Sequence, residues 1–264
     1  MTEKRDLRIL LTNDDGIHAP GLECLVRIAA QLSDDVWIAA PESEQSGASH
    51  SLSLNNPLRS RRLSERKFAV TGTPTDCVIL AVRHLIPDRV PDLVLSGVNR
   101  GHNIADDVTY SGTIAGAMEG TALGIPSMAL SQAYGFDKRS TINWQVAERH
   151  APGLISRFMA RGWQEGVLLN INFPDGKTDE VKGVRTSVQG KRDQSKLCIE
   201  QRLDPRHEPY YWMMYERGDS IPAEGTDLAA IENGYISVSP LHLNLTHHEV
   251  LGNISETLHD YRIE

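Results

Sequence analysis

The stretch LRILLTNDDG, residues 7–16, decides the fold class of this 264-residue chain. Its first half, residues 7–11, is a compact apolar run of the kind that forms a buried strand, and its second half is a polar turn. Apolar residues at helical spacing follow between residues 19 and 32, and a second strand is predicted at 36–40. A buried strand, a turn, a helix and another buried strand form the repeating unit of an α/β protein with a parallel sheet.

The same alternation continues through the first two thirds of the chain. Further strands are predicted at 92–96, 126–130 and 167–173, and further helices at 75–85, 112–123 and 146–159. Strands that are apolar throughout and separated by helices indicate a parallel sheet covered on both faces. We therefore predict an α/β fold, with a Rossmann-like, doubly wound, mostly parallel sheet in residues 1–184 and a C-terminal β-rich extension.

Residues 51–70 break the alternation and are predicted to form a β-hairpin excursion from the main domain. The segment carries a basic patch, made of Arg59, Arg61, Arg62, Arg66 and Lys67. A solvated hairpin face explains these charges. A surface that steers phosphate groups toward the protein is the alternative.

Residues 185–222 also fit no strand–helix unit and are predicted to form an extended oligomerisation arm. The arm contains YYWMMY at 210–215, an apolar aromatic strand that would be prone to aggregate if its edge stayed uncovered. Exchange of the arm between subunits would cover that edge, so we expect a homodimer or homotetramer. A hairpin packed on its own domain is the alternative. Residues 223–264 are expected to return a strand and a helix to the main domain.

Composition argues against several classes of protein. The formal net charge is −8, whereas a protein that wraps a nucleic-acid duplex presents a basic face. The cysteines at positions 24, 77 and 198 lie far apart and are expected to be reduced thiols of a cytoplasmic protein. We find no apolar run long enough for a signal peptide or a membrane span, so no membrane partner is expected.

Ligands of an open parallel sheet bind at the carboxyl ends of its strands, and three informative loops follow such ends. In the first, TNDDG at 12–16, the turn that Gly16 permits can bring the carboxylates of Asp14 and Asp15 together. Two crowded carboxylates repel each other unless a cation or a proton lies between them. Taken alone, this loop fits a metal site and an ordinary surface turn equally well.

The second loop, PESEQSGASHS at 41–51, is rich in hydroxyl groups. It offers the side-chain oxygens of Ser46, Ser49 and Ser51 as metal ligands or phosphate donors. A flexible polar connection explains the same composition and is the preferred explanation for this loop by itself.

The third loop, SGVNRGHNIADDVTYSGT at 96–113, carries the strongest signal. Asn99 and Asn103 offer amide and carbonyl groups, and the loop ends at Ser111-Gly112-Thr113, which opens a predicted helix. The start of a helix leaves free N–H groups and a partial positive charge, which suit an anion such as phosphate. Ser111 would also serve as an ordinary N-cap, but loops of this length in compact domains are usually functional.

The absence of several well-known motifs narrows the class of enzyme. The chain has no phosphate-binding GxxxxGK[ST] segment, no GxGxxG after its first strand and no GxSxG turn, which argues against a Walker-type ATPase, a dinucleotide enzyme and a serine hydrolase. TGTPTD at 71–76 has the pattern of a capping box at a helix start, for which a structural role is sufficient.

The loops, in their order along the chain, resemble the SurE (stationary-phase survival protein E) family of 5′/3′-nucleotidases. The matching segments are TNDDG at 12–16, SGAS at 46–49, TGTPTDCV at 71–78, SGVNRGHN at 96–103, YSGTIAGAMEG at 110–120, YYWMM at 210–214 and GYISVSPL at 234–241. The resemblance implies a metal site made of Asp14, Asp15, Ser46 and Asn99. It also implies that the phosphate is held at Ser111, Gly112 and Thr113, near Asn103. One departure is Gln45, beside Glu44, where many members have a basic residue, a change that bears on phosphate affinity or substrate preference.

The chemistry of these ligands agrees with the resemblance, because carboxylate, hydroxyl and amide oxygens suit Mg²⁺ or Mn²⁺. We expect one divalent cation per subunit, with Asp14, Asp15 and Asn99 as the catalytic group. The expected reaction is hydrolysis of nucleoside 5′-monophosphates to nucleoside and phosphate, with 3′-monophosphates as a further candidate substrate. A broader acid phosphatase or short-chain exopolyphosphatase is the alternative in the same class. A non-catalytic metal–nucleotide sensor is the alternative from another class.

Overall fold

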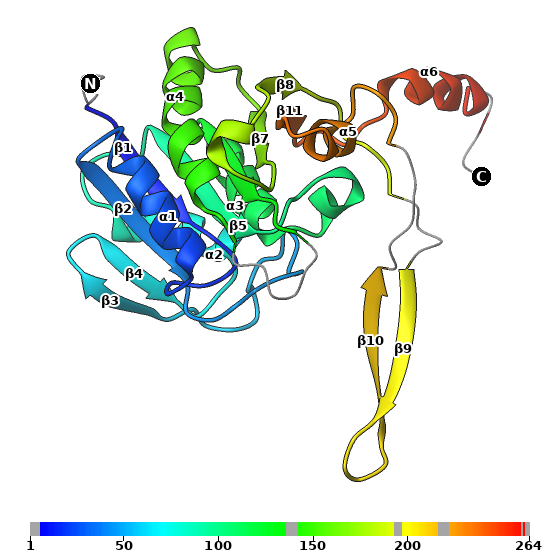
Figure 1. Ribbon diagram of the computed structural model, residues 1–264, viewed down its shortest axis with the longest axis horizontal. Helices are drawn as coiled ribbons and strands as arrows, with labels where there is room; N and C mark the ends of the chain where they lie inside the picture. Colours follow the sequence, from blue (N-terminus) through cyan, green and yellow to red (C-terminus); the bar gives the residue numbers. More distant parts are fainter. Residues whose placement is uncertain (1–5, 136–141, 193–196, 216–221, 260, 262–264) are drawn as a thin grey trace.

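The protein is described by a computed structural model that covers residues 6–135, 142–192, 197–215, 222–259 and 261. Strands and helices alternate along its main body (Figure 1). In chain order they are β1 (Arg8–Thr12), α1 (Pro20–Ala29), β2 (Asp35–Pro41), β3 (Ser60–Ser64), β4 (Lys67–Val70), α2 (Pro74–Leu80), η1 (Ala81–Leu85), β5 (Leu93–Arg100), η2 (Ala105–Thr109), α3 (Gly112–Ala122), β6 (Ser127–Gln132), α4 (Gln145–Arg161), β7 (Val167–Phe173), η3 (Thr178–Glu180), β8 (Val184–Thr186), α5 (Asp227–Glu232) and β11 (Ile236–His242). The predicted helix at 75–85 is α2 followed by η1, which has π-helical geometry.

Within the described residues, the main sheet has nine strands in the order β3-β4-β2-β1-β5-β6-β7-β11-β8. The strands from β4 to β7 in this order are parallel neighbours, whereas β3 and β11 run antiparallel to β4 and β7. The chain first adds strands on one side of β1 and then on the other, so the strand order reverses between β1 and β5. This topology confirms the predicted Rossmann-like, mostly parallel sheet.

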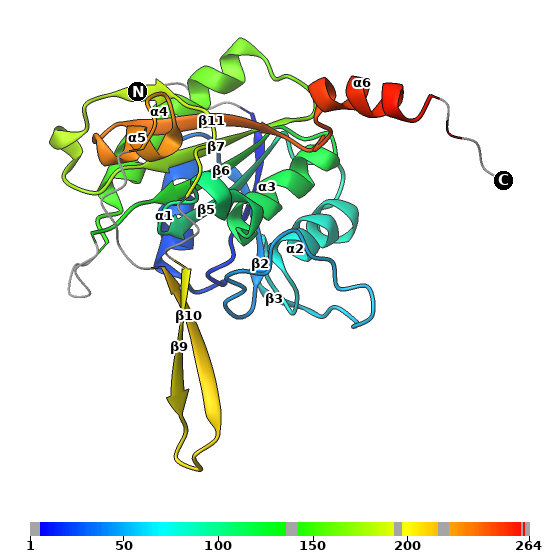
Figure 2. The same ribbon diagram turned by 90° about the vertical axis from the view of Figure 1, so that its right-hand side faces the viewer.

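Helices cover both faces of the sheet (Figure 2). Successive residues of a strand point to opposite faces, so Ile9 and Leu11 of β1 lie in the core beneath α1 and α4, and Leu10 lies in the core beneath α2. All three side chains are fully buried. α3 packs beside α2 and covers β5, β6 and β7. Burial on both faces explains why the strands read as continuous apolar runs.

The hairpin predicted at 51–70 is shorter than expected and belongs to the sheet. β3 and β4 form it over residues 60–70, and β4 pairs in parallel with β2. Its basic side chains have local partners: the Arg61 guanidinium donates to the Glu42 carboxylate at 2.7 Å, and the Arg66 guanidinium lies 5.7 Å from the centre of the Trp37 ring. These contacts agree with a solvated face at the edge of the sheet.

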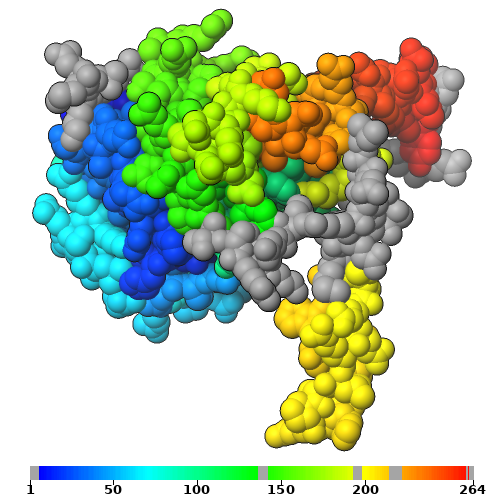
Figure 3. All heavy atoms as spheres, viewed as in Figure 1, coloured from blue at the N-terminus to red at the C-terminus, as the bar shows by residue number. Residues whose placement is uncertain are grey.

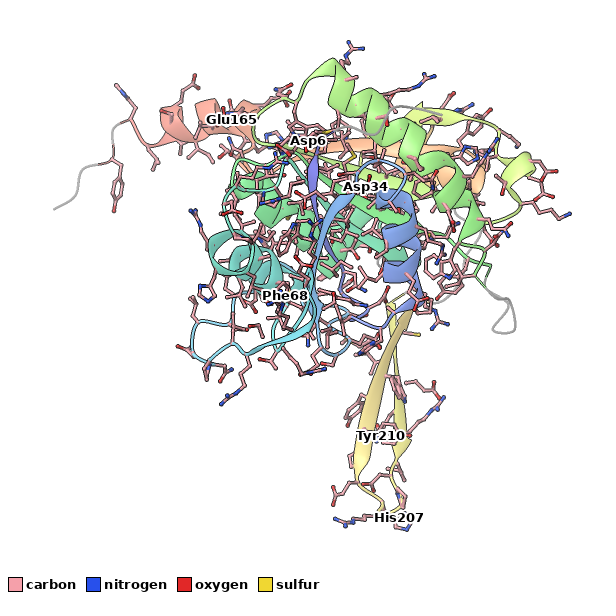
Figure 4. The ribbon with its side chains drawn as sticks, turned by 90° about the vertical axis from the view of Figure 1, so that its left-hand side faces the viewer. Asp6, Asp34, Phe68, Glu165, His207 and Tyr210 are labelled. Atoms are coloured by element: carbon pink, nitrogen blue, oxygen red, sulfur yellow. The ribbon has the colours of Figure 1, made fainter. Side chains whose placement is uncertain are left out.

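A second hairpin projects from the body of the molecule (Figures 1 and 3). Its strands, β9 (Leu197–Leu203) and β10 (Pro209–Tyr215), pair antiparallel. Tyr210 lies on this hairpin and His207 at its tip, well away from the sheet (Figure 4). Several large apolar side chains on it are exposed, namely Ile199, Leu203, Tyr211, Trp212 and Met213. The hairpin lies within the predicted arm, 185–222, whereas β8 is part of the main sheet, and a role of the arm in assembly stays a prediction.

The C-terminal part of the chain returns to the body through α5 and β11, and β11 pairs with β7 and β8. The last helix, α6 (His248–Thr257), extends beyond the sheet and exposes Val250, Leu251 and Ile254 (Figure 1). Within the described ranges, no helix combines the length and the apolar character needed to cross a bilayer.

Candidate metal and phosphate site

The first and third loops meet where the strand order reverses, between β1 and β5. Thr12, the last residue of β1, is the register partner of Ser96 in β5. The register of β5 against β6 shifts between Ser96 and Asn99. Gly97 lies in this shifted segment with a φ of +136°, and a Cβ atom there would be 2.2 Å from the Leu130 carbonyl oxygen. Only glycine fits this position, and the backbone it permits leads β5 into Asn99.

Asp14 is enclosed between β1 and the start of α3. Its side chain is buried, and the Thr113 hydroxyl donates a hydrogen bond to its Oδ1. A Cβ atom on Gly112 would lie 2.8 Å from the Asp14 Cβ, so the helix start is in close contact with this residue. Burial is the largest influence and raises the pKa of Asp14 from 3.8 to about 6; the bond from Thr113 opposes the rise, and the charge of Asp15 adds to it.

Asp15 is partly buried and lies against the third loop. The Arg100 backbone N–H donates to its Oδ2 at 3.1 Å. Burial raises the pKa of Asp15; the bond from Arg100 opposes this rise, and the charge of Glu44 adds to it. The turn therefore holds two neighbouring carboxylates that are costly to keep ionised.

These residues fit a hard divalent cation. Among the described residues, no basic side chain forms an ion pair with Asp14 or Asp15. Three buried oxygens toward the carboxyl ends of β1 and β5 lack hydrogen-bond partners among the described residues, namely Thr12 Oγ1, Asn13 Oδ1 and Ser96 Oγ. A cation at the carboxylates would offset both the burial and the mutual repulsion of the charges, and oxygen donors of this kind suit Mg²⁺ or Mn²⁺.

The second loop lies against the first, because the Gln45 N–H donates to the Asp14 carbonyl oxygen at 2.8 Å. The Ser46 hydroxyl is exposed and donates to Glu44 Oε1 at 2.9 Å. The Asn99 amide nitrogen donates to the Gly101 carbonyl oxygen, also at 2.9 Å. In the described hydrogen bonds neither side chain reaches the two aspartates, so metal binding by Ser46 and Asn99 stays a prediction.

The predicted phosphate-binding residues at the start of α3 have structural partners. Ser111 is the N-cap, and its Oγ accepts a hydrogen bond from the Ile114 N–H at 3.1 Å. The Thr113 hydroxyl is directed at Asp14, so its observed role is to orient a carboxylate. The first backbone N–H groups of a helix have no partner inside the helix. Those of Gly112 and Thr113 are such groups, and phosphate binding by this segment stays a prediction.

Asn103 is fixed by a buried amide network that the sequence analysis did not identify. Its backbone N–H donates to Asn172 Oδ1 at 2.8 Å, and its carbonyl oxygen accepts from Asn170 Nδ2 at 2.8 Å and from Asn172 Nδ2 at 3.2 Å. Its side-chain amide donates to Ser131 Oγ at 2.9 Å. The available signal was NIN at 170–172, two amides on one face of an otherwise apolar strand. The side-chain NH₂ group of Asn103 has two hydrogens, and the hydrogen bond to Ser131 Oγ uses one of them.

Comparison with known proteins decides the family. The family model described as Survival protein SurE matches residues 9–196, which include β1 from Ile9 onward, β5 and all the loops of the site. The chain belongs to the SurE family. The resemblance in the sequence motifs is thereby confirmed.

Individual members of the SurE family are similar over almost the whole chain. A protein of Parvibaculum lavamentivorans named 5′-nucleotidase SurE is 58% identical over 96% of this chain and 92% of its own length. A protein of Brucella anthropi with the same name is 57% identical over 96% of this chain and 97% of its own length. The crystal structure of the SurE protein from Aquifex aeolicus superimposes with a TM-score of 0.82 at 39% identity, covering 95% of this chain and 99% of that one. Membership in the SurE family implies a divalent-metal requirement, which agrees with the paired carboxylates.

Proposed function

We propose that this protein is a divalent-metal-dependent phosphomonoesterase that hydrolyses nucleoside 5′-monophosphates to nucleoside and phosphate. The observation that carries the proposal is the pair of neighbouring carboxylates at the reversal of the strand order, with Asp14 buried against the N-terminus of α3 and Asp15 partly buried against the third loop. Relatives that are 54–58% identical over 95–96% of this chain are named 5′-nucleotidase SurE.

The cation in this proposal is one Mg²⁺ or Mn²⁺ per subunit, held by Asp14, Asp15, Ser46 and Asn99. Such a cation, when bound, polarises a phosphoryl oxygen and lowers the pKa of a bound water. The chain itself supplies the orientation of the ligands. The Thr113 hydroxyl holds Asp14, and the Arg100 N–H holds Asp15. Partners of this kind fix the direction of a carboxylate and so tune its affinity for a metal.

The phosphate group is assigned to the helix start and to Asn103. The backbone N–H groups of Gly112 and Thr113 point out of the first turn of α3, where the helix dipole favours negative charge. The amide network described above fixes the backbone of Asn103 on both sides. Donors that are already in place stabilise the charge that develops on the phosphoryl oxygens at little cost in reorganisation.

The proposed assembly is a homodimer or homotetramer built through the β9–β10 hairpin. Trp212 is 53% exposed and Met213 is 76% exposed on this projecting element. Apolar side chains exposed on an element of this size mark an interaction surface. A second copy of the chain is the proposed partner, and no nucleic-acid duplex or membrane is proposed.

The test of the reaction is phosphate release from a panel of 5′- and 3′-nucleoside monophosphates and short polyphosphate, with and without Mn²⁺ or Mg²⁺. We expect release from the 5′-monophosphates only when metal is present. The Asp14→Asn variant should be inactive, whereas Asp88→Asn, which removes an exposed carboxylate far from this turn, should be active. Release from polyphosphate alone would favour the exopolyphosphatase alternative. Tight nucleotide binding without release would favour the sensor alternative.

A further inference from the structure

Tyr134 lies beside the third loop at the carboxyl edge of the sheet. Gln132, the last residue of β6, is the register partner of Arg100 at the end of β5. Tyr134 follows two residues later. The two neighbouring strands therefore present Arg100 and Tyr134 at the same edge as the paired aspartates.

Contacts fix the Tyr134 ring against this loop. The Arg100 guanidinium lies 5.8 Å from the centre of the ring. A Cβ atom on Gly101 would be 3.4 Å from Tyr134 Cε1, so the edge of the ring packs against the loop backbone. The same two loop residues also contact the predicted metal ligands: the Arg100 N–H bonds Asp15, and the Gly101 carbonyl accepts from Asn99.

The ring nevertheless stays accessible to a ligand. Tyr134 is 39% exposed, and Arg100 is exposed as well. Aromatic faces and guanidinium planes are the groups on which proteins stack nucleobases, and such stacking tolerates any base because every base has a π face. A nucleoside 5′-monophosphate carries its base one ribose away from its phosphate. Recognition of the base thus needs a flat side chain that lies near the phosphate donors but is separate from them.

We propose that Tyr134, together with Arg100, forms the platform on which the nucleobase of the substrate stacks. This inference rests on the proposed nucleotidase function, since it assigns the base-recognition part of that same site. Tyr110 is the natural comparison, because it is also exposed, at 60%, and directly precedes Ser111. Its carbonyl oxygen accepts from the Ser49 N–H, which places it between the second loop and the phosphate side of the site.

The experiment compares adenosine 5′-monophosphate, uridine 5′-monophosphate and ribose 5-phosphate, which has no base, as substrates with Mn²⁺ present. Loss of one stacked base is worth about a 5- to 150-fold change in binding, and a half-exposed platform should give the lower end of that range. In Tyr134→Ala we expect KM to rise about 5- to 10-fold for the adenosine substrate and less for the uridine substrate. The KM for ribose 5-phosphate should stay unchanged. Tyr134→Phe keeps the ring and should behave as the wild type.

Two controls separate this inference from the general function. The affinity of adenosine 5′-monophosphate for the metal-loaded wild type and Tyr134→Ala is measured by calorimetry, so stacking is tested even if no phosphate is released. Equal affinity in the two proteins, or an equal rise in KM for all three substrates, would overturn the platform. A loss of base preference in Tyr110→Ala but not in Tyr134→Ala would also overturn it. Absence of phosphate release from wild type would contradict the proposed function alone.

Discussion

Substituting Gly112 by alanine tests how closely α3 holds the metal-binding turn. Gly112 is the first residue of the helix, and an added Cβ would lie 2.8 Å from Asp14 Cβ and 3.0 Å from Asp14 Oδ2. Ordinary contacts between carbon atoms are about 3.5–4.0 Å, so the two groups must separate by at least about 0.7 Å. The helix is packed on the sheet behind this point. Rotation of the Asp14 side chain does not move its Cβ, so the backbone of the turn has to shift and carries the carboxylate with it.

The size of this displacement predicts how far metal binding and phosphate release should fall. Metal–ligand distances are held to within about 0.2 Å, so a carboxylate moved by about 0.7 Å no longer supports the same coordination. We expect the affinity for Mn²⁺ and the rate of phosphate release to fall about 10- to 100-fold, as when a group that orients a ligand is lost. Crowding of this kind costs about 1–3 kcal/mol of stability, and the better helix propensity of alanine returns up to about 1 kcal/mol.

The assay is calorimetric titration of Mn²⁺, with phosphate release from adenosine 5′-monophosphate measured in parallel. The matched control is Gly153→Ala, because Gly153 lies inside α4 and a Cβ there meets no atom within 4 Å. That variant should bind metal as the wild type does and gain up to about 1 kcal/mol of stability. Wild-type metal affinity and turnover in Gly112→Ala would refute the close packing of α3 on Asp14.

Three further outcomes are expected. Thr113→Val should weaken Mn²⁺ binding about 10- to 100-fold in a calorimetric titration, whereas Thr113→Ser, which keeps the hydroxyl on Asp14, should bind Mn²⁺ as the wild type does. The pKa of Asp14 is raised to about 6, so the protonated form stabilises the fold at low pH and that stability is lost as the pH rises through 6. Urea unfolding of the metal-depleted wild type should show about 1 kcal/mol less stability from this group at pH 7 than at pH 5. Asp14→Asn should lack this contribution. An identical pH dependence in the wild type and in Asp14→Asn would contradict the raised pKa of Asp14. Replacing residues 197–215 by a short flexible linker should leave a monomer in light scattering, and a wild type that is already a stable monomer at micromolar concentration would refute the proposed assembly.

The sheet could be predicted from the sequence because its strands are short apolar runs and its helices have regular apolar spacing. Residues 7–16 already contain the first strand and the turn that brings Asp14 to the reversal point. The sequence could not predict which strands pair when they lie far apart in the chain. β4 joins the sheet beside β2, and no local pattern shows which strand a hairpin will pair with.

The position of the acidic pair at the end of β1 could be predicted from the sequence, whereas the groups that orient the two carboxylates could not. Asp14 and Thr113 are 99 residues apart in the sequence, so their hydrogen bond arises only from the packing of α3 on β1. The network around Asn103 depends in the same way on the register of β6 and β7, which aligns Ser131 with Asn172. The spacing of residues within a loop predicts which groups are available, whereas tertiary packing decides which of them are already bonded.

The central claim is that Asp14 and Asp15 bind one divalent cation on which phosphate release depends. The most direct measurement titrates Mn²⁺ into metal-depleted protein and records heat and phosphate release on the same samples, for the wild type and Asp15→Asn. We predict one bound ion per subunit, with activity recovered in proportion to its occupancy in the wild type, and neither signal in Asp15→Asn. Full phosphate release by the metal-depleted protein, or one-site binding and wild-type activity in Asp15→Asn, would contradict the claim.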